Sequence, residues 1–594
     1  MSTAPLRSDR SKDLLWDVES VYATPELWEA DFKRIADALA PFAALKGGLR
    51  SASAVAAMYK AEDDLSLLLD KLRLYAHMKE DEDTSVGENQ SRMARFRAQS
   101  AKISGELAWM RPELLMQSAE TLRAWAQSEE LRAYQRSIEL LLREKPHVLS
   151  TEEETLLGLA GDVFGTAYDT FSKLTNADLK FRDAVDGGGK PHTVTNGTMS
   201  SLLQNKDRVL RESAFGALYQ GYGDHINALA SLLAGSTKSH TFNAQVRKFP
   251  NALDASLFSD NIPRSVYKSL IAAVRQALPI FHEYVALRAK HLRISDTNMW
   301  DFMVPIVPEF ELKVSWEKNR EWVTDSCKPL GDEYMEGVHA SFAERWYDVY
   351  ENKGKRSGAY STGAFGQKPF MLLNYHGTLN DVFTTAHELG HSMHSLMSQR
   401  HQSYRTSDYP IFLAEIASTT NEALLHHHIL ETQSDKQLRA YLLNHLCDSF
   451  RGTLFRQVMF AEFELEIHER LERGEAMTAD SLKEYYYDLN AAYYGPNVKA
   501  DPRIMIEWSR IPHFYYNFYV YKYATGFAAA QIFSQRILKG TAERDLYLGF
   551  LKSGSSHDPL DTVAKAGVNL ADPAVLQQAF AGYKTAINDL DRAL

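Results

Sequence analysis

Cysteine and long apolar runs are both scarce in this chain, and each shortage excludes a class of protein. Cys327 and Cys447 are the only cysteines in 594 residues. Two cysteines cannot form a disulfide framework, and so low a count suits a reducing compartment. No apolar stretch approaches the roughly 18 residues that span a bilayer, and residues 1–10 lack the apolar core of a secretory signal. We therefore expect a cytoplasmic protein without a membrane segment.

An excess of basic charge is also absent. The chain has 66 Lys and Arg residues against 77 Asp and Glu residues, which gives a formal net charge of −11. A negative balance argues against non-specific binding to nucleic acid. There is no fixed-period repeat and no low-complexity tract. The length suffices for two or more subdomains around large cores, and nothing in the sequence indicates the oligomeric state.

The strongest chemical signal is the stretch His387-Glu388-Leu389-Gly390-His391. Two imidazoles at positions i and i+4 project from one helix face, so both can bind a single tetrahedral Zn²⁺. Glu388 points about 100° round the helix from His387. From there its carboxylate reaches a water on the open position of the metal without binding the metal. This is the arrangement that metal-assisted peptide hydrolysis needs.

The residues around this motif predict a helix. Thr378-Leu379-Asn380-Asp381 has the pattern of a capping box, which opens a helix. Apolar side chains then recur at near-helical spacing, at Val382, Phe383, Ala386, Leu389 and Met393.

A third metal ligand must come from outside the motif, because a catalytic zinc usually takes three protein ligands. His394 lies near the same face, but one straight helix cannot easily surround an ion with three residues over two turns. We therefore interpret His394 as a packing residue or an outer partner of the site. The zincin subclass with a third His needs Gly and then His at fixed steps after the second ligand. Those positions hold His394 and Met397, which excludes that subclass.

Glu415 is the best candidate for the third ligand. Between His391 and Glu415 there is no Glu, and Asp408 is the only acid. Glu415 lies in an apolar helix pattern over residues 411–425, where an unpaired carboxylate is costly to bury. Glu415 and Glu422 are seven residues apart, hence on one helix face. We predict that Glu415 binds zinc and that Glu422 orients a ligand His; the alternative is that both are ordinary exposed helix acids.

With these residues the chain resembles the oligoendopeptidase F family, in the thimet oligopeptidase group of zinc peptidases. The likeness is specific across residues 350–530 and looser over nearly the whole chain. The stretches that carry it are 387–391, Phe412 to Glu415 with Ser418 and Glu422, Gly354 to Ser361, Pro369 to Tyr375 and Ile511 to Gly526, and more loosely Leu15-Trp16 and Thr175 to Phe181.

The resemblance implies a fold and a substrate class. The fold would be mostly α, a helical clamshell of two lobes around a deep channel, with a small β-sheet next to the zinc-binding helix. Such a channel admits short unfolded peptides and excludes folded proteins.

Most of the remaining sequence also predicts helix. Residues 26–145 hold several long amphipathic patterns, and helical patterning resumes at about Met199. Between them, residues 181–194 contain a turn-rich break that allows a short hairpin. We predict an N-terminal helical domain of oligopeptidase F type over 1–200 and a zinc metallopeptidase catalytic domain over 201–594.

Three segments are predicted to be irregular or extended. Residues 302–313, with Pro305 and Pro308, have the pattern of a loop and an edge strand. Residues 369–375 form an apolar run that predicts a strand, and an exposed edge there would pair with an extended peptide through main-chain hydrogen bonds. The Gly-rich segment 354–366 is either a connecting loop or a mobile cover for the substrate.

The aromatic stretch at 513–523 is the candidate source of hydrogen-bond donors. On a helix, His513, Tyr516 and Tyr523 would fall within about 80° of one another, with Tyr519 at the edge of that arc. A tetrahedral oxyanion needs donors such as a Tyr hydroxyl or a His nitrogen, and the family that the chain resembles uses His and Tyr donors from this segment. We favour Tyr523 and then Tyr516; the alternative is an aromatic core stripe.

His426-His427-His428 looks like a metal tract but is not predicted to be one. His426 is eleven residues from Glu415, about 16 Å along a helix. That separation is too long for the two residues to share one ion, so we interpret the tract as packed or solvated.

Together these residues predict a zinc-dependent endopeptidase with one zinc per chain, held by His387, His391 and Glu415. Glu388 deprotonates the zinc-bound water as it attacks the scissile carbonyl, and then carries the proton to the leaving amine. Zinc and Tyr523 or His513 stabilise the oxyanion. The predicted partners are short peptides, without nucleic acid or membrane.

Two alternatives to this function stay open. A zinc carboxypeptidase of similar fold would need a cation that binds the terminal carboxylate, and Arg356 or Arg510 qualifies by position alone. An inactive peptide-binding scaffold is the other alternative. The intact Glu388 argues against it, because a binding module has no need of a general base.

Overall fold

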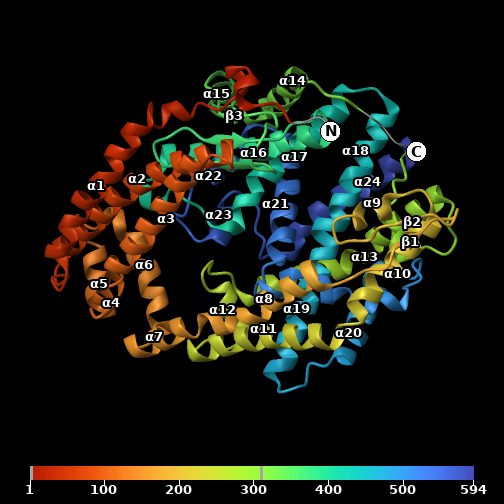
Figure 1. The fold of residues 1–594 in the computed structure, drawn as a ribbon, viewed down its shortest axis with the longest axis horizontal. Helices are drawn as coiled ribbons and strands as arrows, with labels where there is room; N and C mark the ends of the chain where they lie inside the picture. The colour runs from red at the N-terminus through yellow and green to blue at the C-terminus, as the bar shows by residue number, and fades with distance from the viewer. Residues whose placement is uncertain (1–3, 308–311) are drawn as a thin grey trace. The chain divides into compact units, whose positions relative to one another are not determined.

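The computed structural model describes residues 4–307 and 312–594. Within these residues helices dominate, and the β-structure is limited to two small sheets (Figure 1). The chain forms two compact units, and each is built from three separate stretches. Unit 1 consists of Met1–Pro146, Glu311–Glu431 and Phe533–Gly567; unit 2 consists of His147–Phe310, Thr432–Ile532 and Val568–Leu594.

Unit 1 contains the amphipathic helices that the sequence predicts over 26–145. Some of them begin at side-chain caps: Ser51 accepts the N–H of Ala54, and Ser118 accepts that of Thr121. The helices of the first stretch are α1 (Pro25–Leu45), α2 (Ala52–Glu82), α3 (Gly87–Leu107), α4 (Met110–Leu115), α5 (Ala119–Ala126) and α6 (Gln135–Glu144). The other stretches of unit 1 add α14 (Trp316–Cys327), α15 (Asp332–Ala343), α16 (Leu379–His401), α17 (Ile411–Thr432), α22 (Thr541–Leu551) and α23 (Pro559–Lys565).

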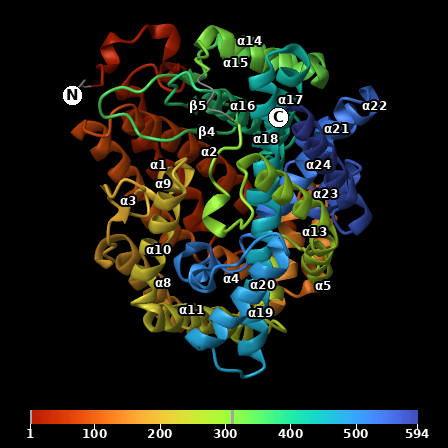
Figure 2. The same ribbon diagram turned by 90° about the vertical axis from the view of Figure 1, so that its right-hand side faces the viewer.

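The sheet of unit 1 lies against the helix that carries the His-Glu motif. It has the strands β3 (Tyr347–Asp348), β4 (Tyr360–Thr362) and β5 (Phe370–Leu372), in the order β3-β5-β4. β5 runs parallel to β3 and antiparallel to β4. α16 contacts both β4 and β5, as Figure 2 shows.

The strand predicted at 369–375 is present, but its prediction as an exposed edge is wrong. β5 is the middle strand, and Phe370, Met371 and Leu372 are all buried. These side chains are apolar because the strand is covered on both sides, and Phe370 and Leu372 join Trp28 and Leu72 of the N-terminal helices in one core cluster. The edge strands of the sheet are β3 and β4.

The Gly-rich segment 354–366 is anchored at its start and paired along β4. The backbone N–H and the Nε of Arg356 both donate to Asp81 of α2. Asn374 donates from its Nδ2 to the carbonyl oxygens of Arg356 and Gly358. Gly358 has a φ of 87°, a value that favours glycine. The mobility of this segment stays a prediction.

Unit 2 is a second helical body with its own two-stranded sheet. The hairpin predicted within 181–194 is confirmed as β1 (Ala184–Val185) paired antiparallel with β2 (Pro191–His192). The helices are α7 (Thr151–Leu159), α8 (Gly161–Lys173), α9 (Met199–Gln204), α10 (Arg208–Gly223), α11 (Ile226–Val246), α12 (Ala252–Leu257), α13 (Arg264–Leu292), α18 (Lys436–Ser449), α19 (Arg456–Glu472), α20 (Ala479–Tyr494) and α24 (Pro573–Ala593). α21 (Tyr521–Ile537) begins in unit 2 and ends in unit 1.

Two further expectations concern loops and membranes. In the segment 302–313, the described residues contain loop and no strand, while 308–311 lie outside the described residues. Among the helices that the structure describes, none combines the length and the apolar character that crossing a membrane requires.

Candidate metal centre

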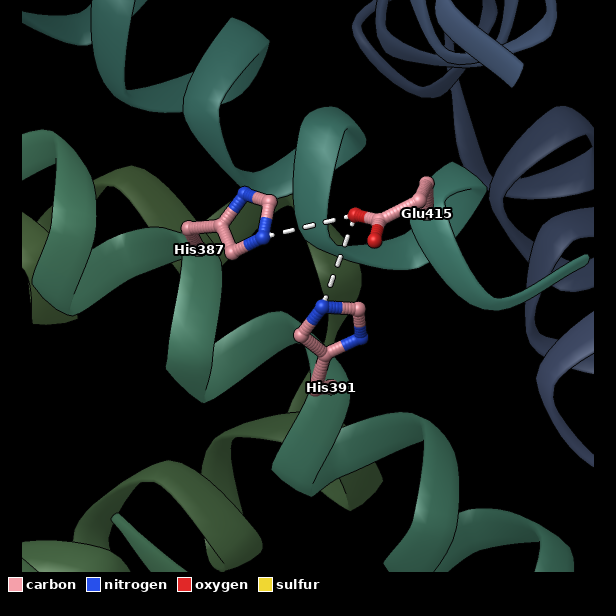
Figure 3. Close-up of side chains that lie close together, drawn as sticks. All are labelled: His387, His391 and Glu415. Atoms are coloured by element: carbon pink, nitrogen blue, oxygen red, sulfur yellow. Dashed lines mark ion pairs between the residues drawn. The ribbon is translucent and has the colours of Figure 1, made fainter. Parts of the chain in front are cut away.

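α16 presents the two histidines of the motif side by side. The helix begins at the predicted capping box: Thr378 accepts the N–H of Asp381, and the Asp381 carboxylate accepts the N–H of Thr378. From this start the helix runs without interruption, so His387 and His391 lie one turn apart, with ring centroids separated by 4.8 Å. Figure 3 shows both rings on the same side of α16.

α17 brings Glu415 to these rings from a second helix. Its Oε2 lies 3.4 Å from Nε2 of His387 and 3.5 Å from Nε2 of His391 (Figure 3). The Ser418 hydroxyl, one turn further along α17, donates to the same oxygen at 3.0 Å. Ser418 therefore orients Glu415. In the sequence, the signal for this role is the position of Ser418 three residues after Glu415, where a helix places the hydroxyl beside the carboxylate.

Gly390, inside the motif, lets the two helices approach closely. A Cβ at this position would lie 2.6 Å from Cα of Ser418 and 2.8 Å from the carbonyl oxygen of Ala417. Only a residue without a side chain fits that contact. Asn421 adds a hydrogen bond from its Nδ2 to the carbonyl oxygen of Ala386 at 3.3 Å. The position of Glu415 thus depends on backbone-to-backbone packing of α16 on α17.

The three side chains fit a zinc ion. In the part of the chain that the structure describes, His387, His391 and Glu415 form the one group of three potential metal ligands, and their donor atoms lie within 4.8 Å of one another. Zinc bonds of about 2.0–2.1 Å in a tetrahedron place neighbouring donors about 3.3 Å apart. The two His–Glu distances are close to this value, and a tetrahedral ion keeps its fourth position open.

Glu422 takes the place predicted for it behind His387. Its Oε1 lies 2.6 Å from Nδ1 of His387, which leaves Nε2 to face Glu415. Burial lowers the pKa of His387, but the carboxylate of Glu422 and then those of Glu388 and Glu415 outweigh it and raise the pKa to about 9. The hydrogen bond to His391, together with the nearby imidazoles, lowers the pKa of Glu415 to about 2 despite burial.

Glu388 lies beside the group in a drier environment. Its exposed fraction is 6%, and burial raises the pKa of its carboxyl, although His387 and His391 oppose the effect. The buried Oε2 has no hydrogen-bond partner within the described residues. A buried carboxylate with a free oxygen is placed to accept a proton.

A cavity of about 500 Å³ opens onto these groups. Its walls include His387, Glu388, His391 and Glu415 of α16 and α17, together with the β4 strand and Gly363. All of these residues belong to unit 1. An extended chain lying along β4 would therefore pass the metal ligands.

The other candidate histidines of unit 1 do not join the group. His394 is fully buried and stacks on Tyr409, with ring centroids 3.6 Å apart, and burial lowers its pKa to about 3. The prediction that His394 packs is confirmed. His426 is buried against the ring of Phe383, and His427 faces Glu431 at 3.4 Å.

The segment 513–523 lies in unit 2, and its prediction as one helix is wrong. A 3₁₀ turn, Pro512–Tyr515, ends before Tyr516, and α21 starts only at Tyr521. Between them Asn517 and Phe518 adopt left-handed conformations, with φ of 49° and 60°. Such conformations stop a right-handed helix.

The rings of this segment still come together, by a different backbone route. His513 lies 5.6 Å from Tyr516, 6.4 Å from Tyr519 and 5.9 Å from Tyr523, measured between ring centroids. Tyr516 is 42% exposed and shares a hydrogen bond of 2.9 Å with the hydroxyl of Tyr168. That bond raises the pKa of Tyr516 to about 12. We call His513, Tyr516, Tyr519 and Tyr523 the His-Tyr cluster.

Known proteins share both the sequence and the fold. The model of Peptidase family M3 matches residues 201–582, and the model named Oligopeptidase F matches residues 113–181. The chain is 39% identical to Oligopeptidase PepF of Bacillus subtilis, over 99% of this chain and 88% of that protein. It is 40% identical to an oligoendopeptidase F homolog of Lactococcus lactis subsp. lactis, over 99% of this chain and 98% of that protein. The crystal structure of oligoendopeptidase-F from Enterococcus faecium has a TM-score of 0.72 at 35% identity, covering 96% of this chain and 99% of that one.

Proposed function

Because this chain belongs to peptidase family M3, in its oligopeptidase F group, and is by homology a zinc oligoendopeptidase, we propose that unit 1 holds its reaction centre. His387, His391 and Glu415 would bind one zinc ion per chain, and Glu388 would be the general base. The observation that carries this assignment is the convergence of three donor atoms within 4.8 Å beside a buried carboxylate.

Each residue of the centre has a separate task in hydrolysis. Zinc, when bound, polarises the scissile carbonyl and lowers the pKa of water. Glu422 fixes the tautomer of His387, so that Nε2 is the ligand atom. Glu388 accepts the proton that the attacking water loses, and then donates it to the leaving amine. The raised pKa of Glu388 suits a group that must both take and return a proton.

Donors for the developing oxyanion are proposed to come from the His-Tyr cluster of unit 2. Its ring distances support this role, because one ligand oxygen could meet more than one donor. Tyr523 remains the favoured donor. The hydroxyl of Tyr516 is engaged with Tyr168, and burial lowers the pKa of His513.

Peptide substrates are proposed to bind along the β4 edge. β4 pairs with β5 on one side only, so its other side offers backbone groups to an extended chain. Main-chain pairing gives affinity with little side-chain preference. Short unfolded peptides fit this mode, and a clamshell of two lobes around a channel would exclude folded proteins.

The domain division and the location are also proposals. The two family-model matches, at 113–181 and 201–582, support an N-terminal region over 1–200 and a catalytic region over 201–594. Both regions contribute stretches to both compact units. The cytoplasm is the proposed location, and two buried free thiols, Cys327 and Cys447, fit it.

Mass spectrometry of a random peptide mixture digested by the zinc-loaded protein tests the proposed function. We expect internal cuts in short peptides of varied sequence. Stepwise loss of C-terminal residues would instead identify a carboxypeptidase, and an undigested mixture would favour an inactive scaffold. Glu388→Gln serves as the control for contaminating peptidases.

A further inference from the structure

Arg73 of α2 reaches the cavity of the candidate metal centre. It lines the same cavity as His387, Glu388 and Glu415, and it belongs to unit 1 with them. Its Nη2 donates to the carbonyl oxygen of Gly363 at 3.3 Å. Gly363 directly follows β4, so the guanidinium is held at one end of the open strand edge.

Arg73 forms no close ion pair with a carboxylate in the described parts of the chain, where its guanidinium bonds the carbonyl oxygen of Gly363. Asp70, one turn earlier on α2, accepts a hydrogen bond from the hydroxyl of Tyr404 at 2.9 Å. Asp81, two turns later, is held by Arg356 and Tyr360. Both acids thus have other hydrogen-bond partners, although the charge of Arg73 still acts on Asp70, where it partly opposes the rise in pKa that burial causes.

The guanidinium also has donors to spare. An arginine side chain has five N–H donors in a planar fork, and the bond to Gly363 uses one. The remaining donors are on a residue that is only partly buried and that lines the cavity. A carboxylate is the group that matches such a fork with two parallel hydrogen bonds.

A purely structural role does not account for the charge of Arg73. One hydrogen bond to Gly363 would hold the end of β4, but β4 is already fixed by its pairing with β5 and by the bond of Tyr360 to Asp81. A neutral donor would serve equally well for that contact. A guanidinium that lines the cavity without a close ion pair is suited to bind an anionic ligand.

We propose that Arg73 binds a carboxylate of the peptide substrate and so determines specificity at one end of the β4 edge. The carboxylate comes either from an Asp or Glu side chain or from the C-terminus of the peptide. The inference rests on the proposed function, because it places the substrate along β4. It makes this protein an oligopeptidase that favours peptides with a negative charge at one fixed distance from the cleaved bond.

The test uses internally quenched peptides that differ in one charge. One series moves a single Glu along a neutral sequence, with Gln at the same position as its partner. A second pair carries either a free or an amidated C-terminus. For the unaltered enzyme we expect kcat/KM to be about tenfold higher for the charged member of one pair, the size of one charge-assisted hydrogen bond at a partly exposed site. The pair that responds identifies the source of the carboxylate.

Variants at Arg73 then assign the preference. Arg73→Gln should bring the charged-to-neutral ratio of kcat/KM down to about one, and Arg73→Lys should keep part of it. Arg73→Glu should reverse it in favour of a Lys-containing peptide. Arg97→Gln is the matched control, because Arg97 is an exposed arginine of unit 1 that pairs with Glu80 outside the cavity. Melting temperatures check that each variant is folded.

Binding gives a readout that does not depend on turnover. In the zinc-loaded Glu388→Gln background, the dissociation constant of the favoured charged peptide should rise about tenfold when Arg73→Gln is added. Equal kcat/KM for every charged and neutral pair would overturn the proposal, as would a preference that survives both Arg73→Gln and Arg73→Glu. Failure of the unaltered enzyme to cut any peptide would instead contradict the proposed function.

Discussion

The metal centre of unit 1 and the His-Tyr cluster of unit 2 bring polar side chains together by opposite means. In the metal centre, two regular helices carry the three candidate ligands, and the spacing along each helix sets which side chains converge. In the His-Tyr cluster, the backbone breaks between a 3₁₀ turn and α21, and the break itself directs the rings. Helical spacing in the sequence therefore predicts which side chains meet in the metal centre, but it does not predict the arrangement of the His-Tyr cluster.

The break in unit 2 is held by residues far away in the sequence. The N–H of Phe518 donates to Oε1 of buried Glu464 at 2.6 Å. The hydroxyl of Ser256 donates to the carbonyl oxygen of Asn517 at 2.7 Å. Left-handed conformations cost roughly 1–2 kcal/mol for each non-glycine residue, and these two contacts offset that cost. Precise geometry in this cluster therefore depends on tertiary partners.

The largest expected effect comes from Glu388→Gln in the metal centre. Gln is nearly isosteric and still forms hydrogen bonds, but it cannot accept a proton at neutral pH. We expect kcat to fall by about 10²–10⁴-fold, with zinc content and melting temperature unchanged. Single-turnover assays on a quenched peptide, with metal analysis of the same sample, measure this. Near-normal turnover in a zinc-replete sample would assign the base to another residue.

Tyr523→Phe tests the proposed role of the His-Tyr cluster of unit 2. A donor that bonds only the developing oxyanion contributes about 2.7–4 kcal/mol to transition-state stabilisation. We expect kcat to fall far more than KM rises. Tyr516→Phe is the matched control, because the hydroxyl of Tyr516 is bonded to Tyr168. A large loss in Tyr516→Phe with none in Tyr523→Phe would transfer the role, and no loss in either variant would leave His513 as the donor.

Gly390→Ala should weaken zinc binding without touching a ligand. The added Cβ would lie 2.6 Å from Cα of Ser418, so α17 must shift and carry Glu415 with it. Overpacking of this kind costs about 1–3 kcal/mol, and we expect zinc affinity to fall by roughly tenfold or more. Chelator competition measures it. Gly105→Ala on α3 is the control, because a Cβ there meets nothing within 4 Å, and an equal loss in both variants would contradict the packing argument.

The smallest effect concerns Glu464 and the pH dependence of stability. Burial raises the pKa of Glu464 to about 8, and the bond from Phe518 only partly opposes it. The unfolded carboxyl ionises near its ordinary value of 4.5, so between that pH and about pH 8 the folded protein holds one more proton. Glu464 should therefore lower the free energy of unfolding as pH rises through this window, by up to about 1.4 kcal/mol per pH unit.

Glu464→Gln isolates that contribution. Gln keeps an acceptor for the N–H of Phe518 but does not titrate. The titratable groups around Glu464 remain in the variant: Nδ1 of His468 bonds the carbonyl oxygen of Glu464, His240 of α11 bonds His468, and Tyr267 of α13 interacts with the Glu464 charge. In denaturant unfolding from pH 5 to pH 8, the free energy of unfolding should fall less, or rise more, with pH for Glu464→Gln than for the unaltered protein, because buried His240 and His468 contribute a slope of the opposite sign. Identical slopes would mean that Glu464 is ionised in the fold.

Sequence reasoning was most successful where chemistry and helix period coincide. The capping box at Thr378, the two histidines, Glu415 and Glu422 all follow from spacing along single helices, and the geometry of unit 1 brings these side chains together. Gly390 had no such signal, because its role is visible only when α17 lies against it.

The wrong predictions concern segments whose conformation is set by strand pairing or by tertiary contacts. β5 became the middle strand because β3, more than twenty residues earlier, pairs on its far side. The segment 513–523 broke because Glu464 and Ser256 hold two residues in left-handed conformations.

Metal analysis tests the central claim most directly. Purified protein and the double variant His387→Ala with Glu415→Ala should be loaded with zinc, desalted and measured by mass spectrometry of the metal content. The account predicts one zinc ion per chain in the unaltered protein and none in the double variant. Two tightly bound ions in the unaltered protein, or zinc retained by the double variant, would contradict it.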